Sequence, residues 1–516
     1  MKRQSEGIQR VHLMRRSVGA VGIVVVMMIA ALAPVVQCQG ADKPNVIVFQ
    51  TDEHNFRTIG AYREHLSEKQ AFPWGKGVAV TTPHLDSLAD NGSIATKYYA
   101  NTPVCSPARA AFVSGHYPQN TPVVANGIHL DDNIITYSKV LKDDGYVTGF
   151  AGKWHLDEGK PGWAPSREFG FTDNRYMYNR GHWKKFEITS DGPRVACRDG
   201  NDNPTYNLCD ADSKSFSTDW LTDRALEFLK ENKDKPFSYF ISYPDPHGPN
   251  SVRPPYDEMY THFKYEKPAT SSKPDAGLPP WGVKDGNTES DVNMAHYFGN
   301  VKLLDDNIGR VVKFLRENSL LNNTILIFTS DHGDLLGEHD RTNKGVPFEA
   351  SAKIPFIVHY PDKIPKGTVI NQAISTVDFM PTLLGLMDMN NPVKVEGKDA
   401  SALFLGKQGA WDNLAFMRGT GKKANAKGGG PESWVGVFTS RYKLIFDETG
   451  EPWLLDLKED PDELVNHINK PENQVVVEYL AKKLKEYGTT YKDPRVQHDN
   501  VSKGIEKILN TNSRSL

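Results

Sequence analysis

A short segment near residue 105 combines a nucleophile, a helix start and a cation. It reads Pro103-Val104-Cys105-Ser106-Pro107-Ala108-Arg109. Proline suits the first helical position, so we expect Pro107 to take it, Ser106 to cap the helix and Cys105 to stand just before it. A group at Cys105 would then face the free N–H groups of a helix N-terminus, which favour anions, and Arg109 lies one turn further on. Most free cysteines are small buried apolar residues, but the proline, the arginine and the anion-binding geometry together favour a reactive group here.

Carboxylates, histidines and a lysine follow four separate apolar runs of the chain. Each run is short and apolar at most positions, as in central strands that are covered on both faces. The runs and the polar residues after them are Asn45–Phe49 with Asp52 and Glu53, Tyr146–Ala151 with Lys153 and His155, Phe237–Tyr243 with His247, and Thr324–Thr329 with Asp331 and His332. Ligands of open α/β sheets bind at the carboxyl ends of the strands, so these side chains are predicted to meet at one edge.

Several carboxylates that meet at one edge are unfavourable together unless a cation lies between them. Oxygen ligands suit a hard divalent ion, Ca²⁺ or Mg²⁺. Taken singly, Asp52 and Asp331 fit turn or helix-cap positions equally well. The metal hypothesis therefore depends on the convergence of the four segments.

The remaining apolar patterns predict the elements that hold this site. A fifth strand at Ile354–Tyr360 and helices at Thr218–Glu231, Asn293–Asn318 and Thr376–Leu386 alternate with the four runs. This alternation predicts an α/β domain over residues 41–390, with a large mixed, mostly parallel sheet flanked by helices. Residues 391–516 are predicted to form a smaller C-terminal α+β subdomain with a small antiparallel sheet and a terminal helix. Its predicted elements are Trp434–Ser440, Tyr442–Asp447, Trp453–Asp456 and a helix at about Gln474–Tyr487.

The first forty residues predict export. Basic residues precede an apolar run at Val18–Val36, and small and polar residues follow as far as Gly40. This order is typical of a signal peptide over residues 1–40, with a periplasmic or secreted product and no membrane span after cleavage; a retained anchor is the alternative. Of the three cysteines that remain, Cys197 and Cys209 are close enough in sequence for a disulfide to close a short loop, as exported proteins allow. Cys105 is then left unpaired.

The segment Cys105–Arg109 matches the C-x-P-x-R signature, and the chain resembles the type I, formylglycine-dependent sulfatases of the alkaline phosphatase superfamily, among them polysaccharide and aryl sulfatases. The resemblance extends over nearly the whole mature chain and implies an alkaline phosphatase-like fold. Further matching segments are Asn45–Glu53, Gly152–His155, the PHGP around His247, Asn323–His339, Lys344, Pro355 and Leu455–Leu457. Two positions depart from the usual pattern, with Glu53 where Asp or Gln is common and His116 where Arg often stands.

The resemblance also implies a role for each site residue. Cys105 would be oxidised to 3-oxoalanine (formylglycine) by a formylglycine-generating maturation enzyme, and its hydrate would attack sulfur and later release sulfate. The implied ligands of Ca²⁺, or of Mg²⁺, are Asp52, Glu53, Cys105, Asp331 and His332. The implied catalytic residues are Arg109 to hold the hydrate, Lys153 and Lys344 to neutralise sulfate oxygens, His155 as the base that releases sulfate, and His247 to protonate the leaving oxygen.

Three functions remain open from the sequence. The leading hypothesis is a sulfuric ester hydrolase that acts on a sulfated polysaccharide or oligosaccharide. The alternatives are a phosphate or phosphonate monoester hydrolase of the same superfamily, and a glycan-binding protein whose Cys105 stays unmodified; the complete lysine and histidine set argues against the latter. A net charge of −3 without a long basic stripe argues against a nucleic-acid partner. His54, His182, His339 and Trp163 are further candidates for lining the substrate pocket.

Overall fold

The structure is a computed structural model that describes residues 43–271, 277–283, 292–420 and 433–512. The predicted signal peptide lies outside these residues. Contacts join Lys43–Leu516 into one compact unit, and the division proposed near residue 390 stays a prediction. No helix among the described residues is long and apolar enough to cross a membrane.

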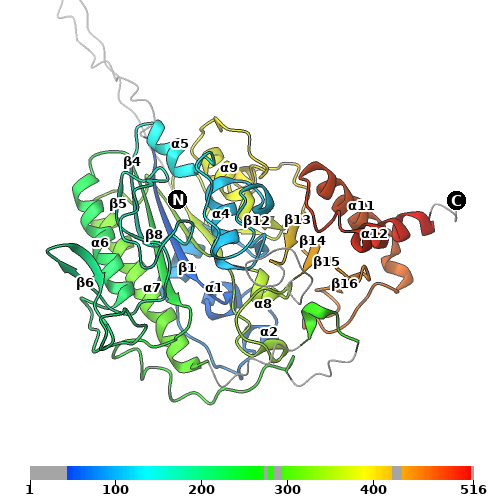
Figure 1. Cartoon of the computed structure of the whole chain (residues 1–516), viewed down its shortest axis with the longest axis horizontal. Helices are drawn as coiled ribbons and strands as arrows, with labels where there is room; N and C mark the ends of the chain where they lie inside the picture. Colours follow the sequence, from blue (N-terminus) through cyan, green and yellow to red (C-terminus); the bar gives the residue numbers. More distant parts are fainter. Residues whose placement is uncertain (1–42, 272–276, 284–291, 421–432, 513–516) are drawn as a thin grey trace, which may run out of the picture. The chain divides into compact units, whose positions relative to one another are not determined.

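A large mixed sheet forms the centre of the molecule (Figure 1). Its eight strands, in spatial order, are β11 (Thr368–Ile370), β2 (Ser93–Ala95), β10 (Phe356–His359), β9 (Thr324–Ser330), β1 (Asn45–Asp52), β8 (Phe237–Pro246), β4 (Val147–Lys153) and β5 (Asp173–Tyr178). β10 pairs antiparallel with both of its neighbours, and the other pairings in this sheet are parallel. The predicted α/β class with a mostly parallel sheet is confirmed.

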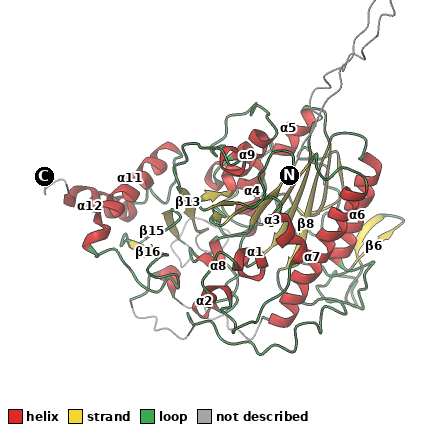
Figure 2. Ribbon diagram, turned by 180° about the vertical axis from the view of Figure 1, so that it is seen from behind, coloured by secondary structure: helices red, strands yellow, loops and turns green. Residues whose placement is uncertain are grey.

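Helices cover both faces of this sheet because alternate residues of each strand point to opposite sides. Val46 and Val48 of β1 belong to a cluster with residues of α4 (Cys105–Ser114), α5 (Tyr137–Asp143) and α9 (Phe379–Leu386). Ile47 and Phe49 face the other way, toward residues of α3 (Pro83–Asp90), α6 (Ser217–Asn232) and α7 (Met294–Glu317). The two views in Figures 1 and 2 show α6 and α7 side by side on one face and α4 and α9 on the other.

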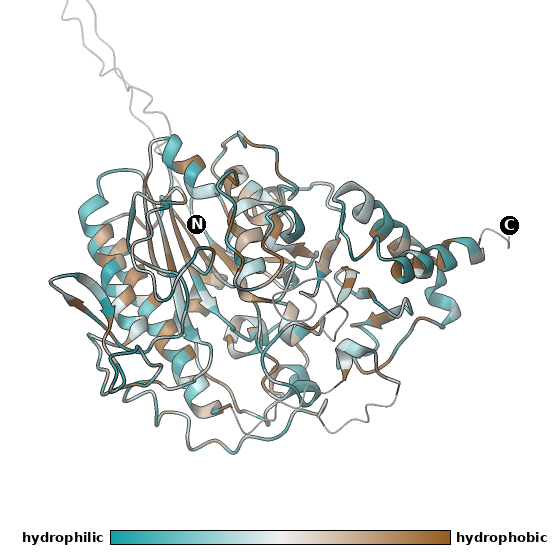
Figure 3. Ribbon diagram, viewed as in Figure 1, coloured by the Kyte–Doolittle hydropathy of each residue, from teal (hydrophilic) through white to brown (hydrophobic). Residues whose placement is uncertain are grey.

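The hydropathy colouring shows the consequence of this layering. In Figure 3 the strands of the central sheet are mostly apolar, whereas α6 and α7 carry polar stretches as well as apolar ones. Buried positions of α7 include Val301, Leu304, Ile308 and Val311, which recur at helical spacing within the helix predicted at Asn293–Asn318. The apolar periodicity therefore packs α7 onto the sheet.

The C-terminal residues form a second, four-stranded antiparallel sheet. Its strands, in order, are β13 (Ala415–Arg418), β14 (Trp434–Phe438), β15 (Tyr442–Asp447) and β16 (Trp453–Asp456). Residues of α11 (Gln474–Thr490) and α12 (Asp499–Asn512) share an apolar cluster with this sheet. The remaining described α-helices and strands are the short helices α1 (Gly60–Arg63), α2 (Glu68–Ala71), α8 (Glu349–Ala352) and α10 (Ser401–Phe404), and the strand pairs β12 (Ile374–Ser375) with β3 (Tyr98–Tyr99) and β6 (Phe186–Thr189) with β7 (Gly192–Val195).

Candidate active site

Four adjacent parallel strands deliver the predicted site residues to one edge of the sheet. β9, β1, β8 and β4 are consecutive neighbours. Thr51 pairs with Ser330, so Asp52 and Asp331 follow side by side. Lys153 is the last residue of β4, and His247 follows the end of β8. The predicted convergence at the carboxyl ends of these strands is what the structure shows.

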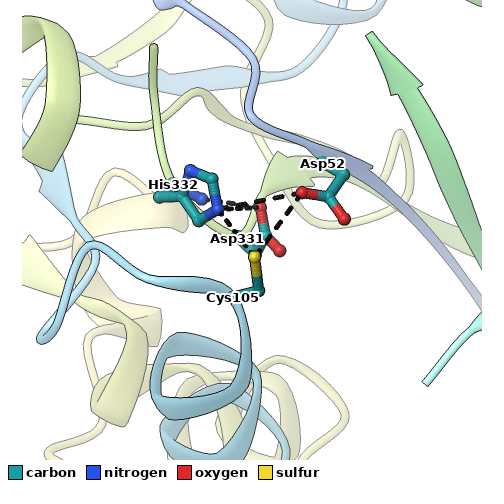
Figure 4. Close-up of side chains that lie close together, drawn as sticks. All are labelled: Asp52, Cys105, Asp331 and His332. Atoms are coloured by element: carbon teal, nitrogen blue, oxygen red, sulfur yellow. Dashed lines mark hydrogen bonds and ion pairs between the residues drawn. The ribbon is translucent and has the colours of Figure 1, made fainter. Parts of the chain in front are cut away.

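Four side chains form the centre of the site (Figure 4). Ligand atoms of Asp52, Cys105, Asp331 and His332 all lie within 4.8 Å of one another. The Cys105 Sγ is 3.2 Å from the His332 Nε2 and 3.9 Å from the Asp52 Oδ1. The His332 Nε2 is 3.7 Å from the Asp52 Oδ1 and 3.5 Å from the Asp331 Oδ1. All four residues are buried, so charge on them is screened little by water.

In both carboxylates of this group, one oxygen pairs with a cation and the other faces the centre. The Asp331 Oδ2 accepts a hydrogen bond of 2.8 Å from the Arg109 Nε. The Asp52 Oδ2 pairs with the Lys153 ammonium and lies 3.4 Å from the Arg109 Nη2. The Asp52 Oδ1 faces Cys105 and His332, and the Asp331 Oδ1 faces the His332 ring and also accepts from the Glu53 and His332 main-chain N–H groups. Two buried cations therefore hold the carboxylates in place and leave one oxygen of each directed at the centre.

The charges around residue 105 favour an anion there. Burial raises the pKa of the Cys105 thiol, but Lys153, Lys344 and His332 outweigh burial and the opposing Asp52 and bring it to about 7. Burial likewise raises the pKa of Asp52, and the neighbouring cations, Lys153 foremost, lower it well below its ordinary value. An acidic group at position 105 is therefore easier to ionise here than in water.

This centre fits a divalent cation. The His332 Nδ1 lies 2.9 Å from the Gly333 carbonyl oxygen, which only accepts hydrogen bonds, so Nδ1 carries the hydrogen and Nε2 faces the two carboxylates. Metal-binding histidines usually donate their second ring N–H to such an acceptor. Burial lowers the pKa of His332, but Asp331 and Cys105 raise it to about 9, so the centre favours positive charge at Nε2. Two carboxylate oxygens, one imidazole nitrogen and the side chain of residue 105 are the groups that would hold the ion.

Glu53, His247 and Lys344 form a second group beside the centre. The His247 Nε2 lies 2.8 Å from the Glu53 Oε2 and 2.8 Å from the Lys344 Nζ, and Lys344 is 3.1 Å from the Glu53 Oε1. Burial raises the pKa of Glu53, and His247 and Lys344 lower it far below its ordinary value. The Glu53 carboxylate contacts both of these side chains and lies outside the four-residue centre, and its role as a metal ligand stays a prediction.

The side chains differ in their access to solvent. Asp52, Arg109, Lys153, Asp331 and His332 are buried, with side chains at most 2% exposed. The His247 side chain is 14% exposed and that of Lys344 is 15% exposed. The site thus has a closed floor of charged groups and a rim that includes His247 and Lys344, and a bound ester would place its anionic end on the floor.

His155 lies close to the floor and is held by its main chain. Its N–H donates to the Asn179 carbonyl at 2.6 Å, and its carbonyl accepts from the Ser106 hydroxyl at 2.9 Å. Its Nδ1 is buried and has no hydrogen-bond partner among the described residues. Burial, followed by Lys153 and Arg109, lowers the pKa of His155 well below its ordinary value. A neutral ring with a free nitrogen is the state that a base requires.

Two site residues adopt a backbone conformation that few residues other than glycine adopt. Glu53, directly after β1, has φ of 62°, and His155, the second residue after β4, has φ of 63°. Left-handed backbone in residues with a side chain is uncommon and concentrates at functional sites. These turns direct both side chains back toward the site from the ends of β1 and β4.

The helix after the signature begins earlier than predicted. α4 starts at Cys105 with Val104 as its N-cap, so Pro107 is the third helical residue rather than the first and Ser106 is not the cap. Proline is tolerated throughout the first turn, because the first N–H groups of a helix have no partner inside it. The Ser106 N–H instead donates to the Asn126 side chain at 2.9 Å. Cys105 still lies in the first turn, at the positive end of the helix dipole.

Of the further pocket candidates, His182 alone lies at the site. Its Nε2 is 2.9 Å from the Lys153 Nζ and 3.8 Å from the Asp52 Oδ2. His54 is buried and bonded to Thr51 and Thr58. His339 stacks on Phe348, and Trp163 packs among aromatic rings. His182 follows β5, an edge strand that is too polar to be predicted from an apolar run. Had β5 been predicted, the residues after it would have been candidates for the site.

The predicted disulfide is present, since Cys197 and Cys209 are bonded. Cys105 is the one free cysteine among the described residues. The polar loop closed by the disulfide carries Tyr206, whose ring lies 4.5 Å from Trp183 and 5.8 Å from His182. The disulfide therefore braces a loop that reaches the rim of the site.

Comparison with known families gives two matches. A family model described as sulfatase matches residues 44–389. A second model, described as the C-terminal part of N-sulphoglucosamine sulphohydrolase, matches residues 337–490. The first covers the whole central sheet and every predicted site residue, and the second covers the antiparallel sheet and α11.

Individual relatives extend over most of the chain. An ulvan-active sulfatase of Formosa agariphila is 29% identical over 463 residues, which are 87% of this chain and 83% of the relative. The solved structure of the yidJ protein of Bacteroides fragilis superimposes with a TM-score of 0.70 at 27% identity, over 88% of this chain and 97% of that one. A phosphonate monoester hydrolase of Agrobacterium radiobacter shares the fold, with a TM-score of 0.67 at 22% identity over 87% and 96% of the two chains.

Proposed function

The chain belongs to the sulfatase family, and from that premise we propose that it hydrolyses sulfate esters of a carbohydrate with a formylglycine made from Cys105. The observation that carries the proposal is the position of Cys105. It lies in the first turn of α4, between two carboxylates and the His332 Nε2. Arg109 and Lys153 supply positive charge on the same floor.

The carbohydrate substrate is supported by the relatives. One is named as an ulvan-active sulfatase, and the C-terminal model is named for an N-sulphoglucosamine sulphohydrolase. The signal-like N-terminus and the Cys197–Cys209 disulfide support export, where such substrates occur. We therefore expect a periplasmic or secreted enzyme that meets its maturation partner before it folds.

In the proposed reaction, residue 105 is a hydrated aldehyde. One of its hydroxyls loses a proton to Asp331 and attacks sulfur, and the bond between sulfur and the alcohol oxygen breaks. Arg109 orients this hydroxyl, while Lys153 and Lys344 hold the sulfate oxygens. Ca²⁺, or Mg²⁺, at the four-residue centre would supply positive charge to the sulfate and lower the pKa of the hydroxyl.

Departure of the alcohol needs a proton, because an unactivated alkoxide is a poor leaving group. The His247 Nδ1 faces its neighbouring Gly248 carbonyl at 2.8 Å, so Nε2 is the atom that exchanges a proton, next to Lys344. His155 then takes the proton of the second hydroxyl, sulfate leaves from residue 105 and the aldehyde is restored. Water rehydrates the aldehyde for the next turnover.

Release of inorganic sulfate tests the proposal. The full exported chain, co-expressed with a formylglycine-generating enzyme, is incubated with a panel of sulfated glycans and with aryl sulfates, with Cys105→Ala as the control. We expect sulfate release by the matured protein and none by Cys105→Ala.

Aryl phosphate and phosphonate esters complete the panel, because the phosphonate monoester hydrolase shares this fold. Turnover of those esters far above turnover of sulfate esters would overturn the sulfatase proposal. Tight glycan binding without any turnover, by protein that retains the Cys105 thiol when produced in its native host, would favour a binding protein.

A further inference from the structure

His182 stacks on the proposed acid. The ring centroids of His182 and His247 are 3.5 Å apart and their planes differ by 9°. His182 comes from the loop between β5 and β6, whereas His247 follows β8. The His182 side chain is 18% exposed and that of His247 is 14% exposed, so both rings belong to the rim of the site. His182 belongs neither to the C-x-P-x-R signature nor to the four predicted strand exits, and the resemblance gives it no role in the reaction.

In each ring of the stack, the Nε2 atom lies within hydrogen-bond distance of a lysine ammonium group. The Lys153 Nζ is 2.9 Å from the His182 Nε2, and the Lys344 Nζ is 2.8 Å from the His247 Nε2. An ammonium group only donates hydrogen bonds, so the His182 Nε2 accepts one from Lys153, while the His247 Nε2 lies between the Lys344 ammonium and the Glu53 carboxylate, 2.8 Å from each. Two imidazolium ions would repel each other at this separation, so the stack favours at most one charged ring. The pair therefore spans the rim between the two lysines that are proposed to hold sulfate.

A single buried ion pair fixes the two chain segments that carry the stack. The Lys184 Nζ is 2.5 Å from the Asp245 Oδ1, and both side chains are fully buried. Lys184 lies two residues after His182, and Asp245 lies two residues before His247. The Asp245 Oδ2 accepts a further hydrogen bond of 2.6 Å from the Thr218 hydroxyl of α6. The backbone around both rings is thus anchored to the same point beneath the rim.

We propose that His182 is a positioning residue for leaving-group protonation: its ring holds the plane of His247, so that the His247 Nε2 faces the departing oxygen. The inference rests on the proposed function, which makes His247 the acid. Without His182, one face of the His247 ring loses its support and the ring can rotate away from Glu53 and Lys344. The loss should then affect esters whose alcohol must be protonated, and should largely spare esters whose leaving group departs as a stable anion.

Three substitutions separate the stack from the lysine contact. His182→Phe keeps a planar ring but loses Nε2, His182→Gln keeps an acceptor for Lys153 but loses the ring, and His182→Ala loses both. Each matured variant is assayed on two sulfate esters that the parent enzyme hydrolyses, 4-nitrophenyl sulfate and one with a poorer leaving group, phenyl sulfate or a sulfated oligosaccharide. For the poorer leaving group we expect His182→Ala and His182→Gln to lower kcat about tenfold with little change in KM, and His182→Phe to retain most of it. On 4-nitrophenyl sulfate all three should stay within about threefold of the parent.

His262→Ala is the matched control, since that histidine also contacts an aromatic ring, Phe263, and lies outside the site. His262→Ala should leave kcat unchanged on both sulfate esters. Rescue by His182→Gln but not by His182→Phe would overturn the proposal in favour of the Lys153 contact, and equal losses on both esters would show a general structural effect. Crystal structures of the parent and of His182→Ala give a readout that does not need activity. The proposal expects the His247 ring to turn in the variant, and an unmoved ring would refute it.

The experiment distinguishes failure of this inference from failure of the proposed function. If the parent hydrolyses phosphonate esters instead of sulfate esters, the sulfatase proposal fails. The His182 variants are then compared on phosphonate monoesters with good and poor leaving groups, because His247 and its stack with His182 would be present in that enzyme too. A leaving-group effect in that series would support the role of His182, and its absence would refute it.

Discussion

Arg109 offers a direct test of how the floor of the site is held together. Its guanidinium makes four contacts: Asp331 at 2.8 Å, the Lys153 carbonyl at 2.7 Å, the Ser242 hydroxyl at 2.7 Å and Asp52 at 3.4 Å. Replacing it with methionine leaves Asp52 its Lys153 partner, but the buried Asp331 Oδ2 loses its cation. Removing one partner of a buried ion pair costs about 3–5 kcal/mol. We expect Arg109→Met to lower the free energy of unfolding by that amount.

The assay is urea denaturation of unmatured protein in EDTA at neutral pH, so that neither turnover nor a bound metal contributes. A double-mutant cycle with Asp331→Asn isolates the pair, because the double variant no longer buries an unpaired carboxylate. We expect the double variant to lose less than the sum of the two single losses. Arg194→Met, which breaks the exposed pair with Glu187, is the control and should change nothing measurable. A loss below about 1 kcal/mol in Arg109→Met, or additivity within about 0.5 kcal/mol, would refute the reasoning.

Three further predictions concern protons, metal and the disulfide. Burial lowers the folded-state pKa of His54 to about 3, so below about pH 6.5 the unfolded chain binds a proton that the folded protein does not. Stability should therefore fall on acidification, by about 2 kcal/mol from this residue between pH 6.5 and 5, and urea titrations of His54→Asn should lack that part. Calcium at a hundred times its dissociation constant should stabilise metal-free matured protein by about 2.7 kcal/mol in thermal unfolding, and an unchanged Tm would argue against the metal centre; Asp52→Asn should show a smaller shift. Replacing both Cys197 and Cys209 by serine should cost about 2–3 kcal/mol in urea denaturation, and no loss would show that the loop is held by other contacts.

The sequence was informative where strands are buried on both faces. β1, β4, β8 and β9 contain runs that are apolar at most positions, and each strand ends within three residues of its predicted bound. Because all four are parallel neighbours, their polar exits had to meet, so the proximity of Asp52, Asp331 and His332 was predictable from that rule; Cys105 comes from α4 and was marked by its sequence motif. The direction of β10 was not predictable, because an apolar run reads the same in a parallel and an antiparallel strand.

The missed features lie where local pattern carries little information. β2 and β11 have three residues each, too few for a periodic signal, and β5 is a polar edge strand. His182, which follows β5, was expected only to line the substrate pocket, and its stack with His247 from a distant strand exit was not predicted. The partners of Glu53 are also set by tertiary packing, because its left-handed backbone turns the carboxylate toward His247 and Lys344.

The central claim is that residue 105 acts as an aldehyde hydrate and not as a thiol. It is tested by comparing sulfate release with the chemical state of residue 105 across preparations made with different amounts of the maturation enzyme. Mass spectrometry of the peptide that contains residue 105 gives the fraction in which the thiol has become an aldehyde. The account predicts that specific activity is proportional to this fraction and is zero when the fraction is zero. Full activity in protein whose Cys105 is entirely an unmodified thiol would contradict it.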